Sequence, residues 1–344
     1  MNTEPLRHWF LAEKRDLPWR NTRDPYAIWI SEVMLQQTQV SVVRPYYLRW
    51  IEQFPTIKDL AAAPLEAVIK CWEGLGYYSR ARNLHAGAQY VVEHYNGQLP
   101  NKEEDLSKIK GLGPYTIGAI LSFAFHQKKA AVDGNVIRVL ARFFQIKEDI
   151  GKSTTLKSMR VLAEKILPNE EPWIISEALI ELGATVCQRK ARCHQCPLKT
   201  DCKGYINGLI DQLPVKSKKI KTEYLYRAVA ILHHNGLLLV KKGEKGKVMS
   251  DLYEFPFFEV TENGITSGKF SEKIEQNFSI AITQATPLSS VTHSFTRYQA
   301  RLDPVLFHCN KMFAVKTMEW LPLAELQKKA FSSGHRRILQ QLLT

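Results

Sequence analysis

The stretch KGLGPYTIGAI, residues 110–120, places Gly111, Gly113 and Pro114 immediately before an apolar run. Proline is favoured at the first position of a helix and glycine suits a tight turn before it, so the stretch predicts two helices joined by a short hairpin. The N–H groups that begin the second helix have no helical partner, and the helix dipole there favours an anion. We therefore expect Gly111 and Gly113 to contact an anionic group such as a phosphate, although an ordinary helix–helix turn has the same pattern.

The charge balance of the chain agrees with a polyanionic partner. Lys and Arg number 47 against 34 Asp and Glu, a net charge of +13. Such an excess favours nucleic acid, but solvated lysine faces give the same balance in many proteins. No segment approaches the roughly 20 consecutive apolar residues of a membrane span, and residues 1–16 lack the pattern of a secretion signal. We expect a cytoplasmic protein, nucleoid-associated if bacterial, with no membrane partner.

The pattern of apolar residues divides the 344-residue chain into two parts. Helical spacing from the N-terminus to about residue 205 predicts an all-α part. Residues 211–224 are rich in lysine and poor in apolar residues, so we interpret 206–225 as an interdomain linker, with an import signal or a DNA-contacting strap as alternatives. Beyond it, two β-rich runs joined by Asn235-Gly236 predict a hairpin, and helix-like stretches follow at 271–277 and 322–342. Residues 226–344 are therefore predicted to be α+β.

Four of the six cysteines crowd into one short segment, at Cys187, Cys193, Cys196 and Cys202. The remaining two stand alone in the sequence. This distribution favours one metal site and two separate thiols over a disulfide framework. Spacing alone does not distinguish zinc from an iron–sulfur cluster, because four cysteines bind either.

Five further segments identify a family. They are DLPWR (16–20), WISEVMLQQTQV (29–40), GLGYYSRARNLH (74–85), VDGNVIRVL (132–140) and the cysteine segment. Together with the hairpin, and in this order, they resemble the endonuclease III superfamily of helix-hairpin-helix DNA glycosylases, and within it the MutY family of adenine DNA glycosylases. The resemblance implies an all-α helix-hairpin-helix glycosylase domain over 1–205, with an iron–sulfur module at 187–202. One [4Fe-4S] cluster would be held there by Cys187, Cys193, Cys196 and Cys202, although the first gap is one residue shorter than is usual in the superfamily.

Tyr115 occupies an informative position in the hairpin. Bifunctional members of the superfamily have a lysine there, two residues after the second hairpin glycine, and its amine forms a Schiff base with the sugar. A phenol cannot form that imine. We therefore expect a monofunctional enzyme that hydrolyses the glycosidic bond with water and leaves an abasic site.

Two carboxylates are suited to this hydrolysis. On a helix, Glu32 would share an apolar face with Ile28, Trp29 and Leu35, where burial would raise its pKa, unless it faces solvent at the edge of that stripe. Asp133 precedes GNVIRVLARFF and is predicted to cap that helix, which favours its ionised form. Surroundings that push two pKa values apart supply an acid and an electrostatic stabiliser. The resemblance implies that Glu32 protonates adenine, while Asp133 and Tyr115 stabilise the cationic sugar.

An adenine inside a duplex must be flipped out before it can meet Glu32. Aromatic rings beside arginines suit base stacking and phosphate contact, which points to Tyr77, Arg80 and Arg82, whereas Tyr78 is expected in the core. By resemblance Tyr77 inserts beside the opposite base and Gln37, next to Thr38, enters the stack from the other side. The resemblance also implies an adenine pocket formed by Arg15, Leu17, Trp19, Arg20 and Glu177.

Residues 226–344 resemble the Nudix-like domain with which the MutY family recognises 8-oxoguanine, and LYEFP (252–256) matches a segment of it. SEKIEQNFSI (271–280) lacks the carboxylates that a Nudix hydrolase needs for Mg²⁺, so a binding role is expected. The family's recognition loop has the form H-x-F-S-H, and residues 293–297 read HSFTR. The resemblance assigns lesion contacts to Phe295, Thr296 and Arg297. A guanidinium cannot accept a hydrogen bond, so Arg297 changes the contact or binds phosphate instead.

The leading hypothesis is a monomeric adenine glycosylase acting on double-stranded DNA with A:8-oxoguanine or A:G mispairs. A thymine or uracil mismatch glycosylase of the same superfamily is an alternative, but the Nudix-like domain argues against it. A non-catalytic DNA-binding protein is a second alternative. The presence of Glu32 and Asp133 in their family contexts argues against that one.

Overall fold

The computed structural model describes residues 1–217, 221–244, 246, 249–295, 297–315 and 317–343. The chain forms two compact units. The first, which we call the helical unit, comprises Met1–Ala62 and Asn83–Lys219. The second, the mixed unit, comprises Ala63–Arg82 and Ile220–Thr344.

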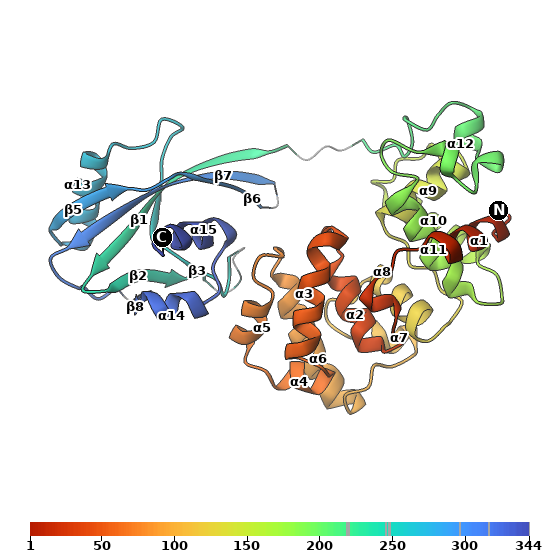
Figure 1. Ribbon diagram of the computed structural model, residues 1–344, viewed down its shortest axis with the longest axis horizontal. Coiled ribbons are helices and arrows are strands. Elements are labelled where there is room, and N and C mark those ends of the chain that lie inside the picture. Colours follow the sequence, from red (N-terminus) through yellow and green to blue (C-terminus); the bar gives the residue numbers. More distant parts are fainter. Residues whose placement is uncertain (218–220, 245, 247–248, 296, 316, 344) are drawn as a thin grey trace. The chain divides into compact units, whose positions relative to one another are not determined.

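Every regular element of the helical unit that the structure describes is helical, which confirms the all-α prediction (Figure 1). None of the described helices is long and apolar enough to cross a membrane. The α-helices are α1 (Glu4–Glu13), α2 (Pro25–Met34), α3 (Val40–Gln53), α4 (Ile57–Ala62), most of α6 (Ser79–Tyr95), α7 (Glu103–Leu106), α8 (Pro114–Ala119), α9 (Gly134–Phe143), α10 (Ser153–Ile166), α11 (Pro172–Thr185) and α12 (Lys203–Ile206). Short 3-10 turns η1 (Pro18–Arg20), η3 (Cys193–Gln195) and η4 (Lys199–Asp201) and a π-helical turn η2 (Ile120–Ala124) complete the unit.

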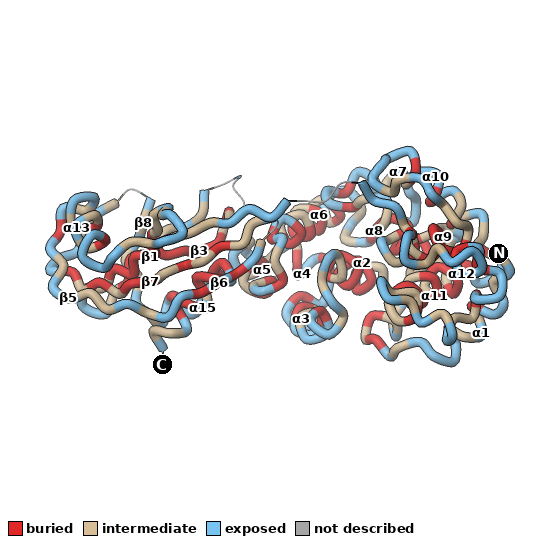
Figure 2. The backbone as a smooth tube through the Cα atoms, turned by 90° about the horizontal axis from the view of Figure 1, so that it is seen from above, coloured by how far each residue is buried: buried red, intermediate tan, exposed pale blue. Residues whose placement is uncertain are grey.

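The core of the helical unit is built around α9 and α11. Leu140 of α9 and Leu179 of α11 are buried in one cluster with Leu6 and Phe10 of α1. Figure 2 shows buried backbone along α9 and α11. Each such side chain contributes roughly 1.5–3 kcal/mol when it leaves water. The packing fixes the two helices from which Asp133 and Glu177 reach the site described below.

The predicted hairpin is present between α7 and α8. Gly113 is the N-cap of α8 and Pro114 its first residue, as the sequence predicted. Gly111 has a φ of 90°. A Cβ there would also lie 2.6 Å from Cβ of Asn83, so both the backbone angle and the close approach require glycine.

The described residues of the mixed unit form an eight-stranded sheet, which confirms the α+β prediction. Its central strands are β1 (Glu223–His234) and β7 (Tyr298–Cys309), parallel from Glu223↔Tyr298 to His233↔His308. β1 also pairs with β2 (Leu237–Lys242) through the predicted hairpin, where Asn235 and Gly236 both have positive φ. The other strands are β3 (Tyr253–Glu254), β4 (Phe257–Glu259), β5 (Ile282–Pro287), β6 (Val291–Phe295) and β8 (Met318–Pro322).

Helices cover both faces of this sheet. Phe270 and Ile274 of α13 (Ser267–Phe278) belong to one buried cluster, and Ile338 and Leu339 of α15 (Ser333–Gln341) belong to another. The stretch predicted as helical at 322–342 is two helices, because α14 (Leu323–Lys328) ends before α15 begins.

The segment Ala63–Arg82, which contains α5 (Leu65–Cys71), belongs to the mixed unit although it lies early in the chain. Glu73 connects it to the C-terminal residues. Its carboxylate accepts hydrogen bonds from the Phe331 N–H at 2.8 Å and from Arg336 Nε at 2.7 Å. A segment predicted to serve the glycosylase domain is thus packed with the residues of the predicted Nudix-like domain.

The predicted linker, 206–225, is only partly described, because 218–220 lie outside the described residues. Its first part packs on the helical unit, where the Leu213 carbonyl accepts from Arg142 Nε at 3.0 Å and the Val215 carbonyl from the Ile150 N–H at 3.0 Å. The domain boundaries at 205 and 226 stay predictions.

Candidate active site

A cavity of about 1490 Å³ opens in the helical unit and is lined from η1, α2, α8, α11 and the N-terminus of α9. It brings together the three predicted catalytic residues and seven of the eleven predicted substrate-binding residues. Lining it are Arg15, Leu17, Trp19, Arg20, Glu32, Gln37, Thr38, Tyr115, Asp133 and Glu177.

Glu32 lies in α2, where it is 5% exposed. Asp24 begins this helix by accepting a hydrogen bond from the Tyr26 N–H. Burial is the main cause that raises the pKa of Glu32 to about 7, and Glu177 and Asp133 add to the effect. A hydrogen bond from the Tyr115 hydroxyl to the Glu32 carboxylate acts in the opposite direction. The predicted burial of this carboxyl and the rise of its pKa are therefore found, and a pKa of about 7 corresponds to partial protonation at neutral pH.

Tyr115 is the second residue of α8 and points its hydroxyl at Glu32. Burial, followed by the charges of Glu32 and Asp133, raises the pKa of the phenol well above its usual range. The hydroxyl thus stays a neutral hydrogen-bond donor within the cavity.

Asp133 caps α9 as predicted. Its Oδ1 accepts from the N–H groups of Asn135 and Val136, both at 2.8 Å, and its Oδ2 accepts from Asn135 Nδ2 at 2.6 Å. Nevertheless burial raises the pKa of Asp133, against these hydrogen bonds. The expectation that the pKa values of Glu32 and Asp133 move in opposite directions is therefore wrong, because both carboxyls are buried.

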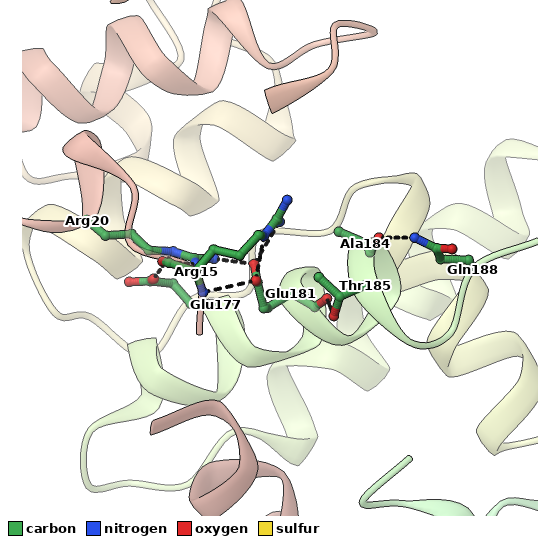
Figure 3. Close-up of polar contacts among 7 residues, drawn as sticks. All are labelled: Arg15, Arg20, Glu177, Glu181, Ala184, Thr185 and Gln188. Atoms are coloured by element: carbon green, nitrogen blue, oxygen red, sulfur yellow. Dashed lines mark hydrogen bonds and ion pairs between the residues drawn. The ribbon is translucent and has the colours of Figure 1, made fainter. Parts of the chain in front are cut away.

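Arginine and glutamate side chains form a network at one wall of the cavity (Figure 3). Arg20 Nε lies 3.2 Å from Glu177 Oε2, and Arg20 Nη2 lies 2.7 Å from Glu181 Oε2. Arg15 Nε donates to Glu181 Oε1 at 2.6 Å. Glu181 is not among the residues predicted from the sequence, although its position four residues after Glu177 on one helix face could have indicated it.

Other residues of the cavity were also missed. Gln36 and Asn135 line it, as do His126 and Trp173, whose rings stack at 3.7 Å between centroids and 12° between planes. Asn135 lies within the quoted motif VDGNVIRVL, but no sequence signal brings His126 to Trp173.

Of the residues predicted to insert into the DNA or contact its backbone, Tyr77, Arg80 and Arg82 lie in the mixed unit, while Gln37 and its neighbour Thr38 lie in the helical unit. Tyr77 has a positive φ and is 44% exposed, whereas Tyr78 is buried as expected. Arg80 is 8% exposed and donates to the carbonyls of Leu75 and Gly76. Its burial argues against the predicted phosphate contact, because the guanidinium is hydrogen-bonded to the turn that precedes it.

Arg82 also has a partner within the mixed unit. Its Nη1 lies 3.2 Å from Asp251 Oδ2, and about a quarter of each side chain is exposed. A phosphate contact of Arg82 stays a prediction.

The predicted recognition loop joins β6 to β7. Phe295 ends β6, and its ring stacks on that of His293 with 5.2 Å between centroids. Arg297 is half exposed and pairs with Glu223 at 3.1 Å. Thr296 lies outside the described residues.

The four clustered cysteines line one small cavity of about 20 Å³, together with Val186, Tyr205 and Ile210 among others. No disulfide forms within the described part of the chain. Nor do three or more His, Cys, Asp or Glu side chains among the described residues form a site for a single metal ion. Four thiol groups that line one apolar cavity fit a cofactor held by four cysteine ligands, such as an iron–sulfur cluster.

Comparisons with known proteins agree with the two parts of the chain. Residues 30–165 match the model of the HhH-GPD superfamily base excision DNA repair protein, and residues 227–341 match that of the NUDIX domain. Among solved structures, a thermostable thymine-DNA glycosylase is 29% identical with a TM-score of 0.54, covering 60% of this chain and 95% of its own. A trapped endonuclease III–DNA covalent intermediate is 27% identical with a TM-score of 0.52, covering 59% and 93%.

Curated relatives narrow the family further. The adenine DNA glycosylase of Buchnera aphidicola subsp. Baizongia pistaciae is 34% identical over 304 residues, which are 87% of this chain and 83% of the relative. The adenine DNA glycosylase of Mus musculus is 45% identical over 210 residues, 58% of this chain and 41% of the relative. The chain therefore belongs to the MutY family of adenine DNA glycosylases, enzymes of base excision DNA repair.

Proposed function

We propose that the chain removes adenine mispaired with 8-oxoguanine or G from double-stranded DNA, as a monomeric, monofunctional glycosylase that leaves an abasic site. The observation that carries the proposal is the Glu32 carboxyl, with a pKa of about 7, in one cavity with Tyr115 and Asp133. We infer adenine as the substrate base from the relatives, and the residues of the cavity supply a chemistry suited to its removal.

Glu32 is the general acid in this proposal. With a pKa near neutrality, a large fraction of the carboxyl carries a proton that it can give to the departing base. Once ionised, the same carboxylate can accept a proton from the attacking water. The hydrogen bond from Tyr115 fixes the orientation of the carboxyl between these two steps.

Asp133 and Tyr115 stabilise the sugar as it becomes an oxocarbenium ion. The Asp133 carboxylate, held by three hydrogen bonds at the start of α9, offers a fixed negative charge that need not reorganise during the reaction. Tyr115 has no amine that could attack C1′ of the sugar, so water is the nucleophile.

The wall containing Arg15, Leu17, Trp19, Arg20 and Glu177 receives the flipped adenine. Leu17 and Trp19 are buried and offer apolar contact, while the Glu177 carboxylate can accept from the exocyclic amine of the base. Gln37, whose φ is 59°, and Thr38 lie at the turn after α2, where they can contact the strand that the base leaves.

Contacts outside the cavity hold the duplex and read the opposite base. Gly111 and Gly113 offer backbone N–H groups to a phosphate at the start of α8. The exposed ring of Tyr77 fills the gap left by adenine, and Phe295 and Arg297, with Thr296 between them, contact 8-oxoguanine. Arg297 can donate to the lesion's oxygen but cannot accept from its N–H.

One [4Fe-4S] cluster on Cys187, Cys193, Cys196 and Cys202 is the proposed cofactor. The cluster would link the segment after α11 to the start of α12, so its proposed role is structural. Arg142 is buried beside Cys187, with its Nη1 3.4 Å from Cys187 Sγ and 2.6 Å from the Gln188 carbonyl oxygen.

The test is base release from labelled duplexes containing A:8-oxoguanine, A:G, T:G or U:G, with strand breaks compared before and after hot alkali. We expect release of adenine alone and breaks only after alkali. Release of thymine or uracil would instead identify a mismatch glycosylase, and binding without release a non-catalytic protein. A covalent adduct trapped by borohydride would contradict the hydrolytic mechanism. Glu32→Gln should abolish release and leave duplex binding largely intact.

A further inference from the structure

Glu181 is a fully buried carboxylate that the chemistry described above does not use. It lies on α11, one turn beyond Glu177. Its oxygens accept from the Arg15 N–H at 3.3 Å, from Arg15 Nε at 2.6 Å and Nη2 at 2.8 Å, and from Arg20 Nη2 at 2.7 Å. A charge this deeply buried is costly unless it is paired and hydrogen-bonded, so the arrangement demands both arginines.

We propose that Glu181 is a positioning residue for adenine excision: it holds the guanidinium groups of Arg15 and Arg20 at the cavity wall and balances their charge in front of Glu32. The inference rests on the proposed role of Glu32 as the acid. Glu181 itself does not line the cavity among the described residues.

The geometry of Arg20 shows how this positioning works. All three guanidinium nitrogens have an acceptor: Nη2 contacts Glu181, Nε contacts Glu177 at 3.2 Å, and Nη1 donates to the Arg15 carbonyl at 3.1 Å. Contacts at all three nitrogens fix the orientation of this planar guanidinium (Figure 3). Because Nε reaches Oε2 of Glu177, that contact leaves Oε1 for the base.

The charge of Glu181 matters as well as its shape. The groups that act on Glu32 are Tyr115 from α8, Glu177 from α11, Asp133 at α9 and Arg20 from η1. Of these, Arg20 lowers the pKa of Glu32 and the two carboxylates raise it. Without the negative charge of Glu181, the charges of Arg15 and Arg20 at this wall would be opposed only by Glu177, which contacts Arg20. The more positive wall would lower the pKa of Glu32 and leave less acid at neutral pH.

The experiment compares Glu181→Gln with Glu171→Gln in the full chain. Both remove one carboxylate at α11, but Glu171 pairs with Arg7, which does not line the cavity. Single-turnover adenine release is measured from pH 5 to 9, together with duplex affinity. For Glu181→Gln we expect a rate constant lowered about 10-fold or more at neutral pH. Its alkaline limb should move to lower pH and its affinity should change little, while Glu171→Gln should match the parent.

A second variant separates charge from shape and covers the case in which Glu181→Gln does not fold. Glu181→Asp keeps the charge but shortens the reach, so we expect a lowered rate constant with the alkaline limb of the parent. A limb unchanged in Glu181→Gln, or a parental rate in Glu181→Asp, would overturn the proposal. If the parent releases no adenine at all, the proposed function fails instead.

Discussion

A glutamate with an ordinary pKa is ionised at neutral pH and cannot deliver a proton, so the chemistry depends on what surrounds Glu32. Nearly all of α2 is buried, and Glu32 lines the cavity. Burial raises its pKa from the usual value near 4.5 to about 7. The hydroxyl of Tyr115 opposes this shift, and so prevents the carboxyl from retaining its proton too firmly to transfer it.

The pH dependence of both activity and stability should report this carboxyl. We expect single-turnover adenine release to fall as pH rises through about 7, because Glu32 then loses its proton. The folded-state pKa is raised, so the stability that protonation contributes is complete below about pH 4.5 and is lost as pH rises through about 7.

Glu32→Gln serves as the matched control for that dependence. It should unfold with a smaller loss of stability between pH 5 and 8, the difference approaching about 3 kcal/mol. Chemical denaturation at each pH measures this quantity. A parental pH dependence in the variant would show that another group controls the transition.

Residue-level features could be predicted as far as local spacing determines them. The apolar face around Glu32 follows from helical periodicity, and Asp133 was identified as a cap because it immediately precedes the helix. The direction of the Asp133 pKa could not be predicted, since burial comes from other segments. Glu181 was missed because its partners, Arg15 and Arg20, lie more than 150 residues away in the chain.

At the scale of elements, the role of Asp133 as the cap of α9 can be tested separately from its proposed role in the reaction. Asp133→Asn keeps an acceptor oxygen for the N–H groups of Asn135 and Val136, so the cap should survive. Asp133→Ala removes it and should lower stability by about 1 kcal/mol. Both variants should lose most adenine release, because both lack the charge. Thermal unfolding and single-turnover kinetics check the two effects separately, and an active Asp133→Asn would exclude a charge-based role.

The hairpin was predictable because proline and glycine act locally, whereas the approach of the next segment was not. A Cβ on Gly118 of α8 would lie 2.4 Å from the Ala130 carbonyl oxygen. Gly118 therefore lets the backbone just before Asp133 pass directly against the helix that carries Tyr115. This close approach brings Tyr115 and Asp133 to one cavity, and no periodicity reveals it.

At the scale of the whole molecule, the cysteine segment joins the end of α11 to α12 within the helical unit. We expect iron and inorganic sulfide in the purified chain, four of each per protein, with the broad visible absorption of an iron–sulfur cluster. Cys196→Ser should lose both and unfold at lower temperature, while Cys309→Ser, which alters a buried thiol outside the segment, should keep them. One zinc per chain would contradict the proposed cofactor.

The order of the two folds along the chain was predictable, because the period of apolar residues changes from helical to alternating near residue 225. The composition of the compact units was not. Ala63–Arg82 has ordinary helical spacing, and its membership of the mixed unit depends on contacts such as Glu73 with Arg336, which join residues 263 positions apart.

Because of that contact, cutting the chain at its linker would divide the mixed unit. A fragment ending near residue 217 would retain Glu73 but lack Phe331 and Arg336, two of its hydrogen-bond donors, so the turn that bears Tyr77 would lose these contacts. Tyr77 and Phe295 also belong to one body. The side chain proposed to fill the gap in the DNA and the loop proposed to contact the opposite base thus belong to one compact unit. The packing of that unit therefore determines the distance between these two DNA contacts.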